Sequence, residues 1–199
     1  MRDVVLATRN QGKLREMAEI ARPYGIRILP LPDGVEMPEE TGLSYLENAR
    51  LKARHGHEAT GMPVLADDSG IEVDALQGLP GIYSARFSGP GATDARNNLL
   101  LLERLAGKAQ RTARYRAALV LCDGPREWSA MGTWDGEILT APRGIGGFGY
   151  DPLFLVPELG RTAAELRSEE KSRHSHRGKA MRALCALLAQ GGAEAEEDR

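Results

Sequence analysis

Cysteine is scarce in this chain of 199 residues, which contains only Cys122 and Cys185. Both lie in apolar stretches, and neither their number nor their spacing matches a disulfide framework or a zinc site. This usage is typical of a reducing compartment, so we expect a cytoplasmic protein.

An excess of positive charge is also missing. The 26 Lys and Arg residues are outnumbered by 28 Asp and Glu residues, which gives a formal net charge of −2. No overall basic field exists to hold a nucleic-acid backbone, so we expect no nucleic-acid partner and only local clusters of cationic groups. Most basic residues are Arg, and the few lysines therefore stand out, at positions 13, 52, 108, 171 and 179.

Long apolar runs are absent as well. None approaches the roughly 18 residues of a membrane span, and the run Val4–Ala7 is too short for the apolar core of a signal peptide. We therefore expect a soluble, unexported protein with no membrane partner. The length and a 42% hydrophobic content suit one globular domain, which we place at residues 1–190, followed by a frayed acidic tail at 191–199.

The chain does contain a regular alternation of strand-like and helix-like segments. The runs 113–122 and 127–134, joined by Asp123-Gly124-Pro125, predict a long antiparallel hairpin. The pattern as a whole predicts a single α/β unit around a mixed, twisted sheet, with a ligand cleft between its parts. We expect further strands at 4–7, 26–31, from 64, 71–74 and 152–156, and helices at 12–21, 44–57, 94–105 and 179–188.

The segment Ala66-Asp67-Asp68-Ser69-Gly70 is the most informative one. It follows the apolar run 63–65, so we expect two carboxylates at a strand's end, where α/β enzymes keep their chemistry. Asp-Asp-Ser-Gly is also good turn chemistry, because these side chains bond to their own backbone and Gly accepts a positive φ. This segment alone is compatible with either a functional site or a turn.

The polar segment Thr8–Lys13 lies between the first expected strand and the first expected helix. Gly12 and Lys13 would place backbone N–H groups and an ammonium where a phosphate can bind, since helix N-termini carry partial positive charge. The segment is not a Walker A loop, which requires Ser or Thr after the Lys, because Leu14 follows here. An ordinary Asn10 helix cap with an exposed Lys13 is the alternative interpretation.

Glu39 and Glu40 precede the capping-box sequence Ser44–Glu47, where the helix dipole favours acidic residues. Together with Asp67 and Asp68 they could also supply the oxygen ligands of Mg²⁺, which needs only one or two protein carboxylates besides substrate phosphates. Such a metal would polarise a phosphoryl oxygen, and the second aspartate could accept a proton from water.

Two further clusters lie in the C-terminal half. Glycines at 144–149 surround Phe148, which could present an aromatic face to a planar base, or belong to a glycine-rich turn with core aromatics. His176-Arg177 lies near the start of a predicted helix and could donate hydrogen bonds to ligand oxygens. The alternative is an ordinary pair of surface side chains with no binding role. The two-residue spacings of His55 and His57 and of His174 and His176 do not suit zinc.

Five segments that together span nearly the whole chain carry a resemblance to a known family. In this order they resemble the ITP/XTP pyrophosphatases, which remove deaminated purine nucleotides from the nucleotide pool: ATRNQGKLREM, EETGLSYLENARLKA, ADDSGIEVDALQGLPGIYSARFSG, GGFGYDPLF and EEKSRHSHRGKA. The resemblance implies an elongated α/β fold with two lobes around a nucleotide-binding cleft, a homodimer and Mg²⁺ dependence. It implies hydrolysis of ITP, dITP and XTP to the monophosphate and pyrophosphate.

The resemblance also implies roles for individual residues. Asp68 would be the catalytic carboxylate and a metal ligand, with Glu39 as its metal partner, and Ser69 would contact the substrate. The triphosphate would be held by Thr8, Arg9, Asn10, Gln11, Gly12 and Lys13. The base and sugar pocket would be lined by Phe148, Gly149, Tyr150, Asp151, Lys171, His176 and Arg177.

One departure from the family pattern is visible at Arg9, where the family usually has Gly. Its side chain must either point away from the phosphates or pair with one of them.

Two other functions stay open: a nucleotide sensor that binds without hydrolysis, and a protein that binds RNA ends. The paired carboxylates oppose the first, because they would repel a triphosphate without a metal. The net charge opposes the second.

Overall fold

A seven-stranded mixed sheet forms the centre of the molecule, in the order β2-β1-β3-β4-β5-β6-β7. The computed structural model describes residues 2–190, so the expected acidic tail at 191–199 lies outside the described residues. β1 is parallel to both β2 and β3, and the remaining neighbours pair antiparallel. The strands are β1 (Arg2–Leu6), β2 (Ile26–Pro30), β3 (Val64–Val73), β4 (Thr112–Cys122), β5 (Glu127–Ile138), β6 (Phe154–Val156) and β7 (Arg161–Thr162).

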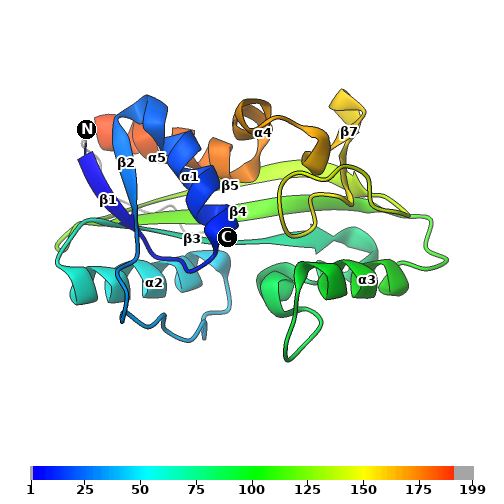
Figure 1. Cartoon of the computed structure of the whole chain (residues 1–199), viewed down its shortest axis with the longest axis horizontal. Coiled ribbons are helices and arrows are strands. Elements are labelled where there is room, and N and C mark those ends of the chain that lie inside the picture. Colours follow the sequence, from blue (N-terminus) through cyan, green and yellow to red (C-terminus); the bar gives the residue numbers. More distant parts are fainter. Residues whose placement is uncertain (1, 191–199) are drawn as a thin grey trace.

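Helices cover both faces of this sheet, with α1 and α5 on one face and α2 on the other (Figure 1). Side-chain caps define where they begin: Asn10, Ser44, Thr93 and Ser175 each accept a hydrogen bond from a backbone N–H in the first turn. Among residues 2–190, no helix has the length and apolar character needed to cross a membrane. The helices are α1 (Gln11–Ala21), α2 (Tyr45–Thr60), α3 (Asp94–Arg104), α4 (Ser168–His174) and α5 (His176–Ala189), with 3-10 turns η1 (Arg22–Tyr24), η2 (Asp74–Leu76), η3 (Gly81–Arg86), η4 (Pro157–Leu159) and η5 (Ala163–Glu165).

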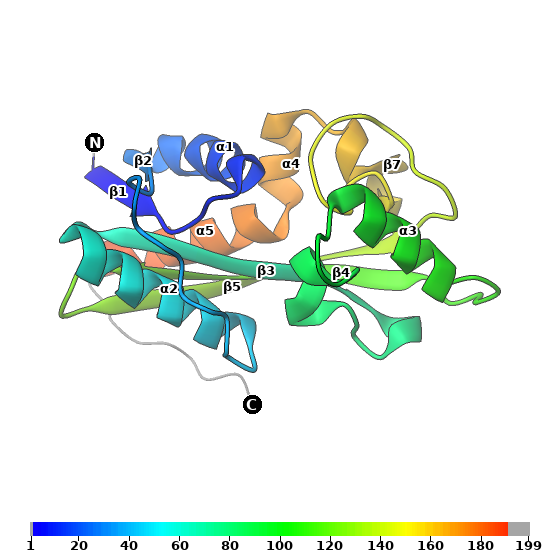
Figure 2. The same cartoon turned by 60° about the horizontal axis from the view of Figure 1, so that its bottom comes forward.

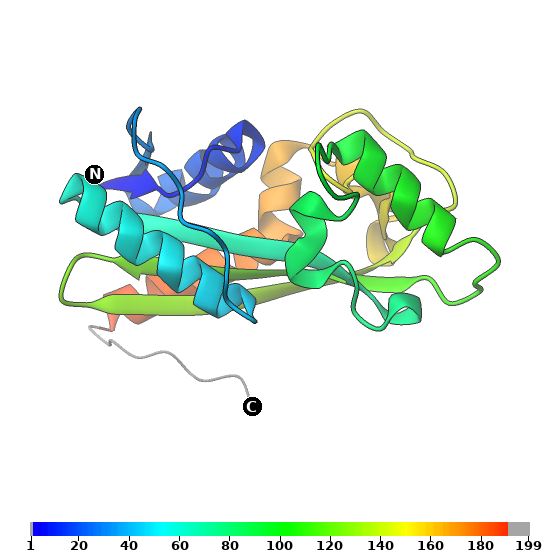
Figure 3. The ribbon, with the colours of Figure 1, turned by 90° about the horizontal axis from the view of Figure 1, so that it is seen from below.

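The molecule is elongated and has two lobes. β1, β2, α1 and α2 form one end, α3 and the β7 region form the other, and the long strands β3, β4 and β5 run between them (Figures 2 and 3). The sheet and the two-lobed outline confirm the predicted fold class.

Three buried clusters fill the molecule, and the period of β3 explains two of them. Successive side chains of a strand point to opposite faces. Leu65 therefore packs with α1 and α5, whereas Val64 and Ala66 pack with α2. The third cluster, which includes Ile71, Tyr115 and the α3 residue Leu101, forms the core of the other lobe.

The prediction of a break after the two aspartates is wrong. β3 continues without interruption through Ser69 and Gly70, so Asp67 and Asp68 lie in the middle of a ten-residue strand and not at its end. The reason is tertiary: a Cβ on Gly70 would lie only 2.2 Å from the carbonyl oxygen of Gly81, so the glycine lets η3 pack against the strand. Gly70 therefore allows the backbone at Gly81 to approach β3 closely and does not form a turn.

The C-terminal helices also differ from the prediction. α4 was not predicted, and α5 begins at His176, three residues before the expected start at Lys179. The backbone of α5 approaches the sheet closely, because a Cβ on Gly132 of β5 would lie 2.1 Å from the His176 carbonyl oxygen. β5 itself continues to Ile138, beyond the predicted end at Trp134.

Candidate functional site

The candidate site lies along an open edge of β3 between the two lobes. β1 pairs with only the first two residues of β3. Among the described residues, no strand covers this edge again until an isolated bridge at Glu72. In between, the Asp67 carbonyl accepts hydrogen bonds from Lys52 Nζ at 2.9 Å and Lys13 Nζ at 3.5 Å. The topology therefore leaves a stretch of β3 exposed to cationic side chains from α1 and α2.

The Asp67 side chain points toward α1 and α5, and three donors converge on its Oδ2, whereas its buried Oδ1 has no hydrogen-bond partner within residues 2–190. Its Oδ2 lies 2.7 Å from Lys13 Nζ and 3.3 Å from Arg177 Nε, and it accepts from the Ser69 hydroxyl at 3.1 Å. Burial alone would raise the pKa of Asp67, but Arg177 and Lys13 outweigh it and hold the pKa well below its usual range. Asp67 is therefore an ionised anchor for two cations.

The Asp68 side chain points to the opposite face, toward α2. Its Oδ1 lies 2.7 Å from Lys52 Nζ, and its Oδ2 is 3.4 Å from the Asn48 amide nitrogen. Burial raises the pKa of Asp68 above its ordinary value, and Lys52 and Lys13 oppose this without cancelling it. A carboxylate with a raised pKa is better suited than Asp67 to accept a proton.

Lys52 joins Asp68 to Glu40, because Lys52 Nζ also lies 3.0 Å from Glu40 Oε1. Burial disfavours the charge on Lys52, but Asp68 and Glu40 offset it and raise the Lys52 pKa. Burial likewise opposes ionisation of Glu40, yet Lys52 and Arg86 lower the pKa of this carboxyl to about 2. The carboxylates of Asp68 and Glu40 thus both pair with the Lys52 ammonium.

The turn before α1 is shaped by its own side chains. The Thr8 hydroxyl accepts from the Asn10 N–H at 3.1 Å, and Asn10 Oδ1 accepts from the Lys13 N–H at 3.0 Å. Gln11 begins the helix and is exposed. The N-terminus of α1 and the Lys13 ammonium therefore both border the open edge of β3.

Arg9 points away from this turn. Its guanidinium donates to the carbonyls of Leu31, Pro32 and Val35 at 2.9, 2.7 and 2.6 Å. This settles the question that the sequence left open in favour of a side chain that ties down the loop after β2.

The glycine-rich loop is held from two sides. Asp151 Oδ2 accepts from the Phe148 N–H at 2.9 Å and lies 2.7 Å from Lys171 Nζ. On the other side, the Gly149 N–H donates to Asp94 of α3 at 2.7 Å. Tyr150 is buried, and its hydroxyl donates to the Ser84 carbonyl at 2.8 Å. The loop is therefore fixed to both α3 and α4.

His176 and Arg177 lie deep in the cleft. The His176 ring is 1% exposed and stacks on Tyr115 with ring centroids 4.7 Å apart, and neither ring nitrogen has a hydrogen-bond partner within residues 2–190. Burial and the nearby Arg177 lower the pKa of His176 well below its usual value, so the ring is neutral at pH 7. A neutral imidazole offers one donor and one acceptor.

Arg177 keeps its charge despite burial. Burial alone would lower the pKa of Arg177, but Asp67, Glu16 and Asp151 raise it. Arg177, His176 and Asp151 line a cavity of about 90 Å³ together with the ring of Phe148. Phe148 lies across Gly12, with Lys171 Nζ 5.1 Å and Arg177 Cζ 5.3 Å from its ring centre.

A second, wider cavity of about 550 Å³ borders the turn before α1, which contains Thr8, Arg9 and Asn10. Glu39 also lines it, but is exposed and makes no side-chain hydrogen bond with another described residue, whereas Glu40 is linked to Asp68 through Lys52. In the described part of the chain, no group of three or more His, Cys, Asp and Glu side chains could hold a metal ion. The cavity is lined by residues that include Thr8, Lys13, Glu39, Glu40, Lys52 and Arg86.

The structure adds two charged residues that the sequence analysis did not assign to the site. Lys52 connects the two carboxylates described above, and the scarcity of lysine was the available signal. Glu16 is nearly buried and lies 3.0 Å from Arg177 and 3.5 Å from Lys171. Its position three residues after Lys13 places both on one face of α1.

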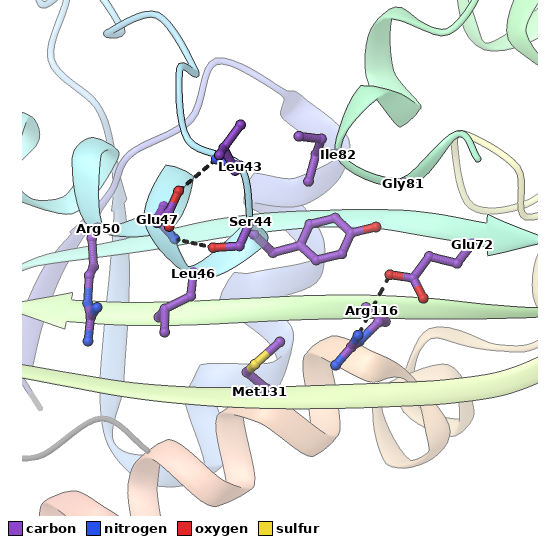
Figure 4. Close-up of a pocket in the computed structure, with 11 residues that line it drawn as sticks. Leu43, Ser44, Leu46, Glu47, Arg50, Glu72, Gly81, Ile82, Arg116 and Met131 are labelled. Carbon is purple, nitrogen blue, oxygen red and sulfur yellow. Dashed lines mark hydrogen bonds and ion pairs between the residues drawn. The ribbon is translucent and has the colours of Figure 1, made fainter. Parts of the chain in front are cut away.

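A separate groove of about 560 Å³ lies on the α2 side of the sheet (Figure 4). Its apolar residues include Leu43, which is 87% exposed, Ile82 and Met131. Charged residues flank them, among them Arg50 and the pair Glu72 and Arg116. This groove contains none of the candidate site residues.

Comparison with known proteins agrees with this geometry. The chain is 54% identical over 191 residues to a dITP/XTP pyrophosphatase of Thioalkalivibrio sulfidiphilus, covering 93% of this chain and 97% of that protein. It is 55% identical to a dITP/XTP pyrophosphatase of Thermus thermophilus over 94% of this chain and 92% of that one. A solved HAM1 protein from Coxiella burnetii superposes with a TM-score of 0.84 at 43% identity, covering 96% of this chain and all of that chain.

The family comparison covers the same region as the sheet and both lobes. Residues 4–187 match the Ham1 family. This span contains Asp67 and Asp68, the segment Thr8–Lys13 and the His176-Arg177 pair. The chain belongs to the Ham1 family.

Proposed function

We propose that this protein hydrolyses dITP, XTP and ITP to the corresponding monophosphate and pyrophosphate, and so removes deaminated purines from the nucleotide pool. One observation carries the proposal: Asp67 joins Lys13 of α1 to the buried Arg177 of α5, and the next residue of β3, Asp68, pairs with Lys52 at the wide cavity. A triphosphate and a base fit the two ends of such a cleft. The names of the relatives at 54–55% identity support the same substrates.

The reaction needs a nucleophile, a leaving group and a proton acceptor. The oxygen of water attacks the α-phosphorus, the bond from that phosphorus to the α–β bridging oxygen breaks, and pyrophosphate leaves with the electron pair. Asp68 accepts the proton of the attacking water. Lys13, which lines the wide cavity, offsets the negative charge that develops on the phosphates, whereas Lys171 pairs with Asp151 and Glu16 away from this cavity.

Glu39 and Glu40, which line the wide cavity, and Asp68, which is paired with the lining residue Lys52, fit a Mg²⁺ ion. Asp68 and Glu40 lie on the same ammonium of Lys52, so their oxygens converge, and Glu39 lines the same cavity. Two carboxylates suffice for Mg²⁺ when substrate phosphates complete its shell. Asp68 with Glu40 or Glu39 would hold the ion, which, when bound, withdraws charge from the phosphoryl oxygens.

The base end explains a preference for hypoxanthine and xanthine over adenine; guanine shares the 6-carbonyl, so we attribute its rejection to its 2-amino group. Hypoxanthine and xanthine present a carbonyl oxygen beside an N–H group, and the charged Arg177 with neutral His176 can donate to the first and accept from the second. Adenine presents an amino group at the same position and faces the guanidinium donor to donor. Leaving a buried donor unsatisfied costs about 1–3 kcal/mol.

Pyrophosphate release from XTP, dITP, ITP, ATP and GTP, each with Mg²⁺, tests the proposal. We expect kcat/KM for XTP, dITP and ITP to exceed that for ATP and GTP at least about a hundredfold, and removal of Mg²⁺ to stop the release. Binding of XTP without hydrolysis would indicate a sensor and contradict the proposal. Comparable ATP hydrolysis would reject the role in clearing deaminated purines.

We also propose that the protein is a homodimer in the cytoplasm. The groove in Figure 4 supports an association, because Leu43 is largely exposed beside Ile82 and Met131. Light scattering at micromolar concentration should report twice the monomer mass. A monomeric wild type would refute the dimer, and Leu43→Asp, which introduces a charge into the groove, tests whether this face forms the contact.

A further inference from the structure

Arg86 lies at the end of η3 and lines the same wide cavity as the turn before α1. It lines this cavity together with Thr8, Lys13 and Lys52, although it comes from a different part of the chain. Its side chain is 42% exposed, and its Nη1 lies 2.6 Å from Glu40 Oε2. A ligand in the cavity would therefore meet cations from two separate parts of the chain, Lys13 of α1 and Arg86 of η3.

The guanidinium of Arg86 has donors to spare. The bond to Glu40 is its only hydrogen bond with the residues that the structure describes, and its Cζ lies 5.2 Å from the ring centre of Tyr83. A guanidinium carries five N–H donors in a planar fork that suits phosphate oxygens. The partly exposed ion pair with Glu40 is weak enough to be exchanged for another anion.

The other cations of the cavity are already engaged. Lys13 pairs with Asp67, and Lys52 pairs with both Asp68 and Glu40. Arg9, which also lines the cavity, uses its guanidinium for backbone carbonyls of the loop after β2. Arg86 is thus the cation of this cavity best able to accept a further anionic partner.

The backbone that carries Arg86 is fixed on both sides by one buried side chain. Asn97 of α3 is 3% exposed; its Nδ2 donates to the carbonyls of Ser84 at 3.3 Å and Ala85 at 3.1 Å, and its Oδ1 accepts from the Ser88 N–H at 2.8 Å. An exposed side chain on a fixed backbone can meet a ligand at a defined position with little loss of order.

We propose that Arg86 is a further substrate-binding residue that contacts the outer phosphates of the triphosphate, together with Lys13. The contact replaces the bond from Arg86 to Glu40 and leaves Glu40 with Lys52. This inference rests on the proposed function, because it assumes that the wide cavity holds the phosphates.

Calorimetric titration with pyrophosphate and Mg²⁺ tests this contact without turnover. We expect Arg86→Ala to weaken pyrophosphate binding about ten- to a hundredfold while XMP binding changes less than about twofold. Arg86→Lys, which keeps the charge but loses the fork, should lie between wild type and Arg86→Ala. The kinetic counterpart is a raised KM for XTP with a smaller change in kcat.

Arg54→Ala is the matched control, because Arg54 is also an exposed arginine paired with a glutamate, Glu127, and lies outside the cavity. It should leave both ligands unaffected. Unchanged pyrophosphate binding in Arg86→Ala, or an equal loss for pyrophosphate and XMP, would overturn the role of Arg86. A wild type that binds neither ligand would instead refute the proposed function.

Discussion

The pKa values of two adjacent carboxyls, one on each face of β3, are shifted in opposite directions. On the face toward α1 and α5, Asp67 meets Lys13, Arg177 and Ser69, and its pKa is lowered. On the face toward α2, Asp68 meets Lys52 and Asn48, and its pKa is raised. Both side chains are buried, but Asp67 has two cations in direct contact, whereas Asp68 has one and also the like charge of Glu40 nearby, which raises its pKa.

This difference suggests separate roles: Asp67 stabilises the folded protein, and Asp68 accepts a proton in the reaction. A buried carboxylate that neutralises two cations contributes to the folded state, and its loss leaves those cations without a partner. A carboxylate whose charge is poorly compensated is a better proton acceptor and adds little to stability. The four predictions below test this division, from the largest expected effect to the smallest.

Asp67→Asn should mainly destabilise the protein. It leaves Lys13 and Arg177 facing a neutral amide, and breaking a buried ion pair on one side costs about 3–5 kcal/mol. Urea unfolding of the metal-free protein measures the loss. The Asp67 pKa is lowered in the folded state, so its contribution is complete above the unfolded pKa of about 3.9 and declines as pH falls below it. A loss below about 1 kcal/mol at pH 7 would refute the anchor role.

Asp68→Asn should mainly abolish turnover. Removal of the proton acceptor is expected to lower kcat by at least about a hundredfold, which is the lower end of general-base effects. The free energy of unfolding should change by less than about 1 kcal/mol, because Lys52 keeps Glu40 as a partner. Pyrophosphate release and urea unfolding of the same preparation measure both quantities. Near-normal turnover at saturating Mg²⁺ would remove Asp68 from the mechanism.

Lys13→Ala should separate the phosphate end from the base end. Lys13 anchors to Asp67, but its ammonium also borders the wide cavity. We expect XTP to bind about tenfold more weakly while XMP, which lacks the outer phosphates, is affected much less. Competition of XMP against XTP gives both constants. An equal loss for both ligands would place Lys13 away from the outer phosphates.

His176 should produce the smallest effect, a pH dependence of stability on the Asp67 face. Its folded pKa is lowered, so below pH 6.5 the unfolded chain binds a proton that the folded protein excludes. Stability should therefore fall as pH decreases below 6.5, by up to about 1.4 kcal/mol per pH unit. Thermal unfolding between pH 7 and 5.5 checks this. His176→Phe should have a shallower slope, and an identical slope would show that other groups cause it.

The sequence predicted most elements because their signals are local. Asn10 and Ser44 cap their helices, Gly61 ends α2 with a φ of 65°, and the turn after Cys122 closes the long hairpin. The continuity of β3 was missed because it depends on Gly81 packing over Gly70, which no local pattern contains.

The site was predicted as clusters of residue types but not as a geometry. The sequence brought Asp67 and Asp68 together, yet could not assign them to opposite faces without knowing that the strand continues. Lys52 was overlooked because its burial depends on the tertiary position of α2, which no local pattern contains. The direction of Arg9 likewise depends on carbonyls in a distant loop.

The missing side chain at Gly132 sets how deep the base pocket can be. Gly132 is not among the residues that line the cavity. Because it has no Cβ, the backbone of α5 packs directly against β5 at His176, and this contact sets how far the His176 ring reaches into the cavity. Even a methyl group at this position would act as a spacer and push the start of the helix outward. The proposed base pocket therefore has a determinant outside its lining, and we expect substitutions at Gly132 to change which purines are accepted.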